Sequence, residues 1–262
     1  MTSGKGFGDM NLKGKVGLIT GIANGHSVAA GCARAMAAEG AQLACTYLDD
    51  RTKDFAGAVF EEVGAALILP LDVRSDEALD AVFAAVEAEW GRLDFLLHSI
   101  AFCRKDDLHG PVVECSRDGF AEAMDISCHS LIRMAHRARP LMREGGSIIT
   151  VTYHGADQVV DHYNIMGPVK AALESSARYL AAGLGAEGIR VNAISPGPIS
   201  TRAASGIDHF SDLIDDAVAR APEHKLVTVE QVGALAAFLA GDAAAAITGG
   251  LHYVDGGFNI IA

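Results

Sequence analysis

Near its N-terminus the chain reads VGLITGIANGHSVAAGCARAMAAE, residues 16–39. An apolar run suited to a buried strand, Val16–Thr20, leads into a turn of small residues that begins at Gly21, and an Ala-rich helical pattern follows from Val28. Small residues in such a turn let the backbone approach a pyrophosphate at the helix N-terminus, where free N–H groups favour anions. Ser27 is suited to cap that helix. Because GxGxxG is absent, this turn alone permits either a nucleotide site or an ordinary tight turn.

The same alternation of strand and helix continues along the chain. Further β-rich apolar runs cover Gln42–Tyr47, Ala66–Leu71, Leu93–Ser99, Ser147–Tyr153, Arg190–Ser195 and Leu251–Val254. Helical patterns cover Val28–Glu39, Thr52–Val63, Glu77–Trp90, Arg117–Arg137, Ile165–Leu184 and Val229–Leu239. Nearly continuous apolar strands that alternate with helices predict an α/β fold. We expect a doubly wound, mostly parallel seven-stranded sheet with helices on both faces.

The length of 262 residues fits one α/β domain of this kind. We expect a flexible N-terminal segment over residues 1–11 and a single domain over 12–262. The segment 199–222 interrupts the alternation with two short helical pieces flanked by Gly and Pro. Long insertions of this kind in α/β enzymes are usually substrate lids, so we expect a lid there.

Composition excludes several classes of protein. No run of about 18 apolar residues offers a membrane span, and a net charge of −12 disfavours nucleic-acid binding. Five cysteines, odd in number and without CxxC spacing, indicate reduced thiols rather than a disulfide framework. No metal site is expected. The Gly-rich N-terminus lacks the apolar segment of a signal peptide, so we predict a cytoplasmic enzyme or binding protein.

Two further strand ends carry residues suited to a nucleotide. Leu71-Asp72-Val73 ends the third strand, and His98-Ser99-Ile100-Ala101 ends the fourth. Ligands of open α/β sheets bind beyond the carboxyl ends of the strands, near the point where strand order reverses. Three such ends in the expected places favour a bound dinucleotide.

Several motifs then make the chain similar to a known family. In order they are Gly21-x5-Ser27-x-Ala29, Leu71-Asp72-Val73, His98-Ser99-Ile100-Ala101-Phe102, Tyr153-x9-Tyr163-Asn164-x-Met166-Gly167-x2-Lys170, Arg190-Val191-Asn192-Ala193-Ile194-Ser195-x-Gly197-Pro198-Ile199, Ala203-Ala204-Ser205-Gly206-Ile207 and Val254-Asp255-Gly256-Gly257-Phe258. With them the chain resembles, from Leu12 to Ile261, the bacterial enoyl-acyl-carrier-protein reductases of the FabI type, a divergent branch of the short-chain dehydrogenases.

The resemblance implies a Rossmann-type subunit, usually assembled as a homotetramer. It implies reduction of trans-2-enoyl-acyl carrier protein to the saturated acyl thioester with NADH, the last step of the fatty-acid elongation cycle. Acyl carrier protein is then the expected partner, with no nucleic acid or membrane. Two alternatives remain open: a short-chain dehydrogenase acting on another activated alkene or carbonyl, and a nucleotide-binding regulator without turnover.

The resemblance also assigns site residues by position. Cofactor contacts fall on Gly21, Ser27, Val28, Leu48, Asp72, Val73, Ser99, Ile100, Lys170, Ile199 and Thr201. Substrate contacts fall on Cys103, Tyr153 and Tyr163, where Cys103 replaces a small alanine of the family. The implied catalytic set is Tyr153, Tyr163 and Lys170.

The spacing of these residues agrees with alkene reduction. Ordinary short-chain dehydrogenases place a tyrosine four residues before the lysine, but that position, counted from Lys170, is Met166, and the available phenol is Tyr163. An enoyl thioester takes hydride at Cβ while negative charge develops on the carbonyl oxygen two carbons away, so a displaced phenol suits it. Seven residues are close to two helical turns, which predicts Tyr163 and Lys170 on one helix face. Tyr163 would donate to the enolate oxygen, and Lys170 would hold the nicotinamide ribose.

Pro168 stands between the tyrosine and the lysine. Inside a helix a proline removes the hydrogen bond to the carbonyl four residues earlier. Either the helix begins near Met166 or it contains a kink.

The residues after the second strand bear on cofactor choice. They read Thr46-Tyr47-Leu48-Asp49-Asp50, without an immediate basic partner for a 2′-phosphate. Acidic residues there suit a ribose diol, so NADH is expected and NADPH is less favoured, although Arg51 and Lys53 are close. His224-Lys225 stands where the family has a basic pair, which makes the patch for an acidic carrier protein thinner.

Overall fold

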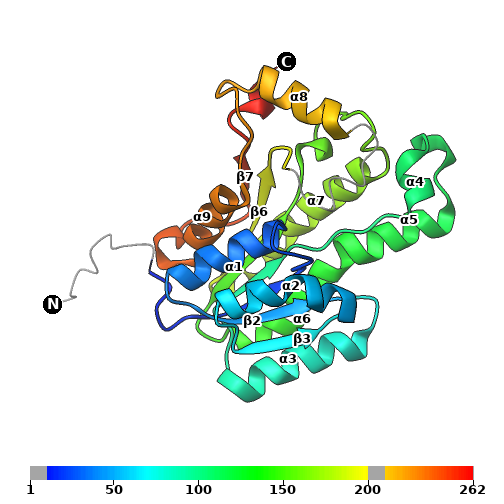
Figure 1. Ribbon diagram of the computed structural model, residues 1–262. Coiled ribbons are helices and arrows are strands. Elements are labelled where there is room, and N and C mark those ends of the chain that lie inside the picture. Colours follow the sequence, from blue (N-terminus) through cyan, green and yellow to red (C-terminus); the bar gives the residue numbers. More distant parts are fainter. Residues whose placement is uncertain (1–10, 200–209, 262) are drawn as a thin grey trace.

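The structure is a computed structural model that describes residues 11–199 and 210–261 (Figure 1). Within these residues, seven parallel strands form one sheet in the order β3-β2-β1-β4-β5-β6-β7. The strands are β1 (Val16–Thr20), β2 (Gln42–Tyr47), β3 (Leu67–Pro70), β4 (Phe95–His98), β5 (Gly146–Val151), β6 (Ile189–Pro196) and β7 (Leu251–Val254). The expected doubly wound α/β architecture is confirmed.

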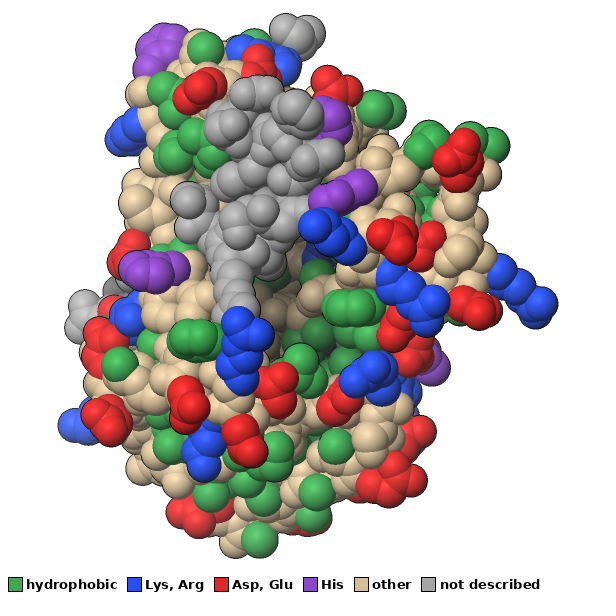
Figure 2. All heavy atoms as spheres, turned by 45° about the vertical axis from the view of Figure 1, so that its right-hand side comes forward, with side chains coloured by type: hydrophobic (Ala, Val, Ile, Leu, Met, Phe, Trp, Pro, Cys, Tyr) green, Lys and Arg blue, Asp and Glu red, His purple; other side chains and the backbone are tan. Residues whose placement is uncertain are grey.

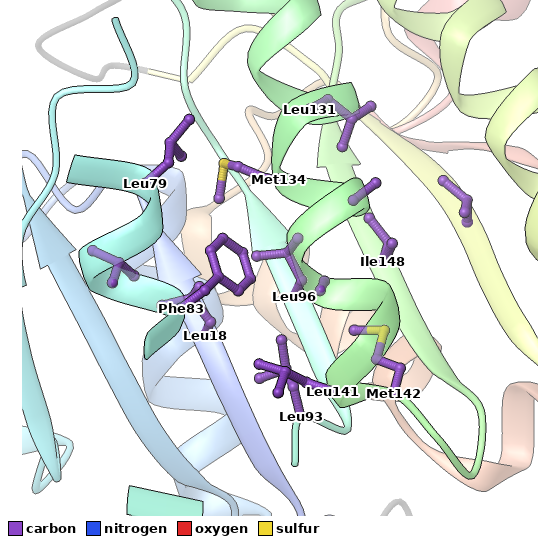
Figure 3. Close-up of a cluster of buried hydrophobic side chains, with 14 of the residues drawn as sticks. Leu18, Leu79, Phe83, Leu93, Leu96, Leu131, Met134, Leu141, Met142 and Ile148 are labelled. Carbon is purple, nitrogen blue, oxygen red and sulfur yellow. The ribbon is translucent and has the colours of Figure 1, made fainter. Parts of the chain in front are cut away.

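Helices cover both faces of this sheet (Figure 1). One face packs against α1 (Val28–Ala38), α2 (Asp50–Glu62) and α9 (Val229–Ala240). The other packs against α3 (Asp76–Trp90), α6 (Ser130–Ala138) and α7 (Met166–Leu184). Figure 3 shows this second core, where Leu96 and Ile148 of the sheet lie among side chains such as Phe83 and Leu131 of the helices. Because both faces are covered, the strands are apolar along their whole length.

The strand order reverses between β1 and β4. From β1 the next two strands, β2 and β3, are added toward one edge of the sheet. The chain then returns through α3 and places β4 on the other side of β1. Gly21 follows β1 with a φ of +88°, and a side chain there would overlap the carbonyl oxygen of Ser99 after β4. Only glycine combines this left-handed backbone with so close an approach, so Gly21 permits the two strand ends to lie together.

The chain differs from the sequence-based expectation after β4. A short helix, α4 (Lys105–His109), was not predicted, and it leads into α5 (Arg117–Met124). The helix predicted over Arg117–Arg137 is not regular, because a π-helical turn over Asp125–His129 separates α5 from α6. Figure 1 shows α4 and part of α5 projecting away from the sheet.

Hydroxyl side chains explain this irregular turn. Ser130 Oγ donates to Ile126 O at 2.6 Å. Ser127 Oγ accepts from Phe102 N at 2.9 Å and lies 3.1 Å from Phe102 O. Such bonds compete with the regular helical pattern. The prediction of an uninterrupted helix was wrong because apolar periodicity does not report contacts with a distant segment.

Two predicted segments fall partly beyond what is described. Residues 1–10 of the expected N-terminal segment and residues 200–209 of the expected lid lie outside the described residues. The rest of the lid range contains α8 (Phe210–Arg220). In residues 11–199 and 210–261, no helix combines the length and apolar character needed to cross a membrane.

Candidate active site

A cavity of about 390 Å³ lies at the carboxyl ends of the strands, beside the point where their order reverses. This volume is within the range of roughly 300–1,000 Å³ found for ligand pockets. Figure 2 shows a hollow on this side of the molecule, with hydrophobic side chains inside it and charged side chains around it. The predicted cofactor residues that line the cavity are Gly21, Ser27, Val28, Leu48, Asp72, Val73, Ser99, Ile100 and Lys170.

One predicted cofactor residue, Ile199, is not among the described residues that line the cavity. Ile199 packs against the hydrophobic core that contains α1 and α9, and Thr201 lies outside the described residues. Several further lining residues were not assigned individually as cofactor contacts from the sequence, namely Ile22, Ala23, Asn24, Thr46, Tyr47, Thr52, Leu71, Arg74, Ala101, Phe102, Ile126 and Val151. Most flank a predicted residue, but Ile126 comes from the π-helical turn, for which the sequence offered no signal.

The start of α1 suits a pyrophosphate. Ser27 caps this helix: its Oγ accepts from Ala30 N at 3.2 Å and donates to Asn24 O at 2.9 Å. Val28, the first residue of α1, lines the cavity, so the positive end of the helix dipole lies at the cavity wall. Together with the close backbone approach at Gly21, this forms the anion cradle that a dinucleotide requires.

At the far end of the cavity the basic side chains are already engaged. Asp72 accepts from Arg74 Nη2 at 2.6 Å, and this hydrogen bond lowers the pKa of the Asp72 carboxyl. Lys53 Nζ lies 5.4 Å from the centre of the Tyr47 ring, and the Arg51 guanidinium lies 5.7 Å from that of Phe55. Cations held against aromatic faces gain attraction there, which makes them less available to a 2′-phosphate.

Lys170 joins the cavity to the core of the sheet. It is buried in the first turns of α7, and its Nζ donates to Val151 O, at the end of β5, at 2.8 Å. An ammonium group carries three donors, and this bond uses one. Burial lowers the pKa of Lys170 to about 8. One turn later, Glu174 accepts from Thr152 Oγ1 at 2.8 Å.

The two tyrosines meet in the segment between β5 and α7. The ring centres of Tyr153 and Tyr163 are 4.9 Å apart with an angle of 64° between the rings. Both belong to a small apolar cluster with Cys103, Leu108 and Met166, so all three predicted substrate residues come together. Burial raises the pKa of both phenols. Tyr153 Oη is buried and has no hydrogen-bond partner among the described residues.

The expected helical relation between Tyr163 and Lys170 was wrong. α7 begins at Met166, and Tyr163 lies in the turn that precedes it. Pro168 therefore occupies the first helical turn, where its missing N–H has no intrahelical acceptor to lose. Of the two possibilities left open by Pro168, the late helix start is confirmed. Tyr153 likewise lies beyond the end of β5 rather than within it.

His98 is a neutral structural residue beneath the cavity. Its Nε2 lies 2.8 Å from Ser130 Oγ and its Nδ1 lies 2.9 Å from Thr150 Oγ1. Because Ser130 gives its own proton to Ile126 O, it must accept from Nε2–H, and Nδ1 then accepts from Thr150. Burial, with the nearby Lys170 charge as a second cause, lowers the pKa of His98 to about 3. In the described part of the chain, no three His, Cys, Asp or Glu side chains could jointly hold a metal ion.

Comparisons with known proteins agree on one family. The family model described as Enoyl-(Acyl carrier protein) reductase matches residues 21–259. Enoyl-[acyl-carrier-protein] reductase [NADH] 1 of Rhizobium meliloti is 46% identical and covers 95% of this chain and 92% of its own. The Nostoc enzyme with the same activity in its name is 48% identical, and the match covers 96% of this chain and 99% of the Nostoc chain. The crystal structure of the Anaplasma phagocytophilum reductase in complex with NAD has a TM-score of 0.92 at 43% identity, over 96% of both chains.

Proposed function

The chain belongs to the enoyl-[acyl-carrier-protein] reductase family, and we propose that it reduces the trans-2 double bond of enoyl-acyl carrier protein with NADH. The product is the saturated acyl thioester, and the reaction is the last step of the fatty-acid elongation cycle. The observation that carries this assignment is the pair of packed, buried phenols that precede the helix of Lys170, in a chain whose cavity suits a dinucleotide and is lined by Lys170. The relatives that carry the activity in their names are NADH-dependent.

Bound NADH supplies the hydride that reaches Cβ of the substrate. The residues of this chain would hold it at both ends: Gly21 and the start of α1 take the pyrophosphate, and Lys170 takes the nicotinamide ribose with its remaining donors. The Lys170 ammonium also brings positive charge near the thioester, in a buried place where that charge is poorly screened.

Tyr163 would stabilise the charge that develops on the thioester oxygen. Burial raises its pKa, so the phenol keeps its proton at neutral pH and acts as a hydrogen-bond donor. A fixed donor aimed at a developing oxyanion is effective because it needs no rearrangement during the reaction. A proton from solvent then completes the reduction at Cα.

Tyr153 and Cys103 would form the substrate wall. Tyr153 Oη is buried without a partner in the described residues, and a buried hydroxyl without a hydrogen bond is costly. A thioester group in the pocket would satisfy it. Cys103 packs against the same cluster, and burial raises the pKa of its thiol to about 11, so it acts as a small neutral side chain.

Acyl carrier protein is the proposed macromolecular partner, in the cytoplasm. Carrier proteins of this pathway are acidic, whereas this chain has a net charge of −12, so docking requires a local basic patch. Lys225 Nζ lies 2.9 Å from Glu223 Oε2 in an exposed pair, which makes the expected patch at His224-Lys225 weaker still. Affinity for the carrier should therefore be modest and sensitive to salt.

A homotetramer is the proposed assembly. The outward faces of α6 and α7 expose Ile132 and Tyr179, the latter by 80%. Around them lies a shallow groove with small residues such as Ala172, Ser176 and Gly183. Small residues let helices of neighbouring subunits approach closely, and a self-complementary face fits a two-fold axis.

Isotope transfer tests the reaction directly. With NADH deuterated at the transferred position and a crotonyl thioester as substrate, we expect deuterium at Cβ of the product and a solvent proton at Cα. A panel of ketones should show little turnover under the same conditions. Deuterium on a carbinol carbon would overturn the proposal and make the chain a carbonyl reductase.

A further inference from the structure

Tyr163 is held in an unusual turn. His162 and Asn164, which flank it, have φ values of 62° and 43°. Residues other than glycine seldom adopt the left-handed region, and asparagine is among those that tolerate it best. Such conformations persist only where the surrounding structure imposes them, and they gather at functional sites.

The Asn164 side chain explains what imposes this turn. Its Nδ2 donates to Leu108 O at 2.7 Å, across 56 residues of sequence. Leu108 lies in the last turn of α4, where carbonyl groups have no partner within the helix. The same Asn164 uses its backbone oxygen to accept from Gly167 N at 3.1 Å, at the start of α7. Asn164 therefore ties α4 to the start of α7.

The packing around Tyr163 makes this tie relevant to its hydroxyl. A Cβ atom at Gly155 would lie only 2.6 Å from Tyr163 Cδ1, so the ring rests directly on the backbone at Gly155. The Tyr153 ring packs edge-on against it, and Leu108 contacts the same cluster. With the ring confined in this way, the place of the phenol oxygen depends on where its backbone turn is anchored.

We propose that Asn164 is a positioning residue for Tyr163, acting through its left-handed backbone and its hydrogen bond to Leu108 O. It does not contact the reacting atoms. It holds the phenol at a constant place relative to α4. This inference rests on the proposed function, in which Tyr163 donates to the thioester oxygen.

Two substitutions remove the hydrogen bond but keep a residue that tolerates the left-handed backbone. Asn164→Asp keeps the size but replaces the donor with an oxygen that faces the Leu108 carbonyl, while Asn164→Gly keeps the left-handed conformation without strain and removes the side chain. Because a misplacement of about 1 Å can cost about 100-fold, we expect kcat for a crotonyl thioester to fall roughly 10- to 100-fold in both. The KM for NADH should stay within about twofold, since the cofactor contacts are elsewhere. Asn11→Asp, an exposed site far from the cavity, is the matched control.

A double-mutant cycle with Tyr163→Phe distinguishes positioning from general support. If Asn164 acts through the phenol, Asn164→Asp should lower kcat in the native background and change it by less than about twofold in the Tyr163→Phe background. Thermal unfolding of each variant confirms that it is folded. If Asn164→Asp does not fold, Asn164→Gly replaces it in the cycle. An equal loss in both backgrounds, a loss confined to the KM for NADH, or no loss at all would overturn the inference. Full activity of Tyr163→Phe itself would instead overturn the proposed role of Tyr163.

Discussion

Burial sets the protonation state of the polar side chains at the head of α7. It raises the pKa of the Tyr153 and Tyr163 phenols and lowers that of the Lys170 ammonium to about 8. At neutral pH the site therefore presents two neutral hydroxyl donors and one largely charged ammonium. This combination suits the stabilisation of a developing oxyanion better than proton abstraction by a base.

Removal of the Tyr163 hydroxyl tests its role. In Tyr163→Phe we expect kcat to fall by about 10² to 10³, the usual cost of one oxyanion donor. NADH affinity, measured by fluorescence titration, should be unchanged because the ring remains. Tyr153→Phe is the matched variant on the neighbouring ring and should mainly alter the KM of the thioester. Equal losses of kcat in the two variants would contradict the assignment of the donor to Tyr163.

The lowered pKa of Lys170 predicts a pH dependence. In the proposed function this group binds the cofactor in its charged form, which is lost as the pH rises through about 8. We expect kcat/KM for NADH, which reports the free enzyme, to fall above that pH. In Lys170→Arg the guanidinium keeps its charge, so this fall should disappear even though overall activity is lower. A fall of the same midpoint in Lys170→Arg would assign the titration to another group.

At the scale of elements, the π-helical turn between α5 and α6 shapes the cavity floor. It brings Ile126 to the cavity and is held by Ser130, which is hydrogen-bonded both to Ile126 O and to His98 of β4. His98 thus supports the turn with its Nε2–H. Its neutral state follows from burial and does not change across the physiological pH range.

Ser130→Ala tests how much the hydrogen bond between His98 and Ser130 stabilises the folded protein. It leaves the buried Nε2–H of His98 without its acceptor, which lowers the free energy of unfolding by about 1–3 kcal/mol. Urea denaturation measures the change, and histidine NMR should show the Nε2–H tautomer in the native enzyme. Ser176→Ala, whose hydroxyl has within the described residues one long 3.5 Å contact, with Cys128 Sγ, is the control and should stay within about 0.5 kcal/mol. A Ser130→Ala protein as stable as its control would contradict the arrangement.

At the scale of the whole molecule, the outward faces of α6 and α7 leave large side chains in solvent. Ile132 is 38% exposed and Tyr179 is 80% exposed. Both line the groove on this side of the subunit. An exposed aromatic side chain is typical of protein interfaces, which supports the proposed tetramer.

A charge on this face should separate the subunits. We expect light scattering to give a tetramer mass for the native protein and a smaller species for Tyr179→Glu, because the carboxylate would be buried against its symmetry mate. Val113→Glu, at a residue that is 90% exposed in the short 3₁₀ helix Val112–Glu114 after α4, is the control and should leave the mass unchanged. A monomeric native protein at micromolar concentration would refute the assembly.

Local sequence determined the elements of this fold. Apolar runs, helical periods and the residues of turns depend on near neighbours, so β1, β2 and β7 have the predicted bounds and Ser27 caps α1 as expected. The tight turn at Gly21 could be predicted because only glycine tolerates a φ of +88° so close to another backbone segment. The order of motifs along the chain likewise indicated the family without any knowledge of tertiary contacts.

Only the tertiary structure decided the geometry of the site. The place of Tyr163 depends on the late start of α7, on the left-handed turn around it and on a carbonyl in α4, 56 residues away. The π-helical turn depends on His98 in a strand. Such contacts join residues that are distant in sequence, and their free energies come from burial and hydrogen bonds that no local pattern records. The sequence thus predicted which residues serve the reaction, while packing determined how they face one another.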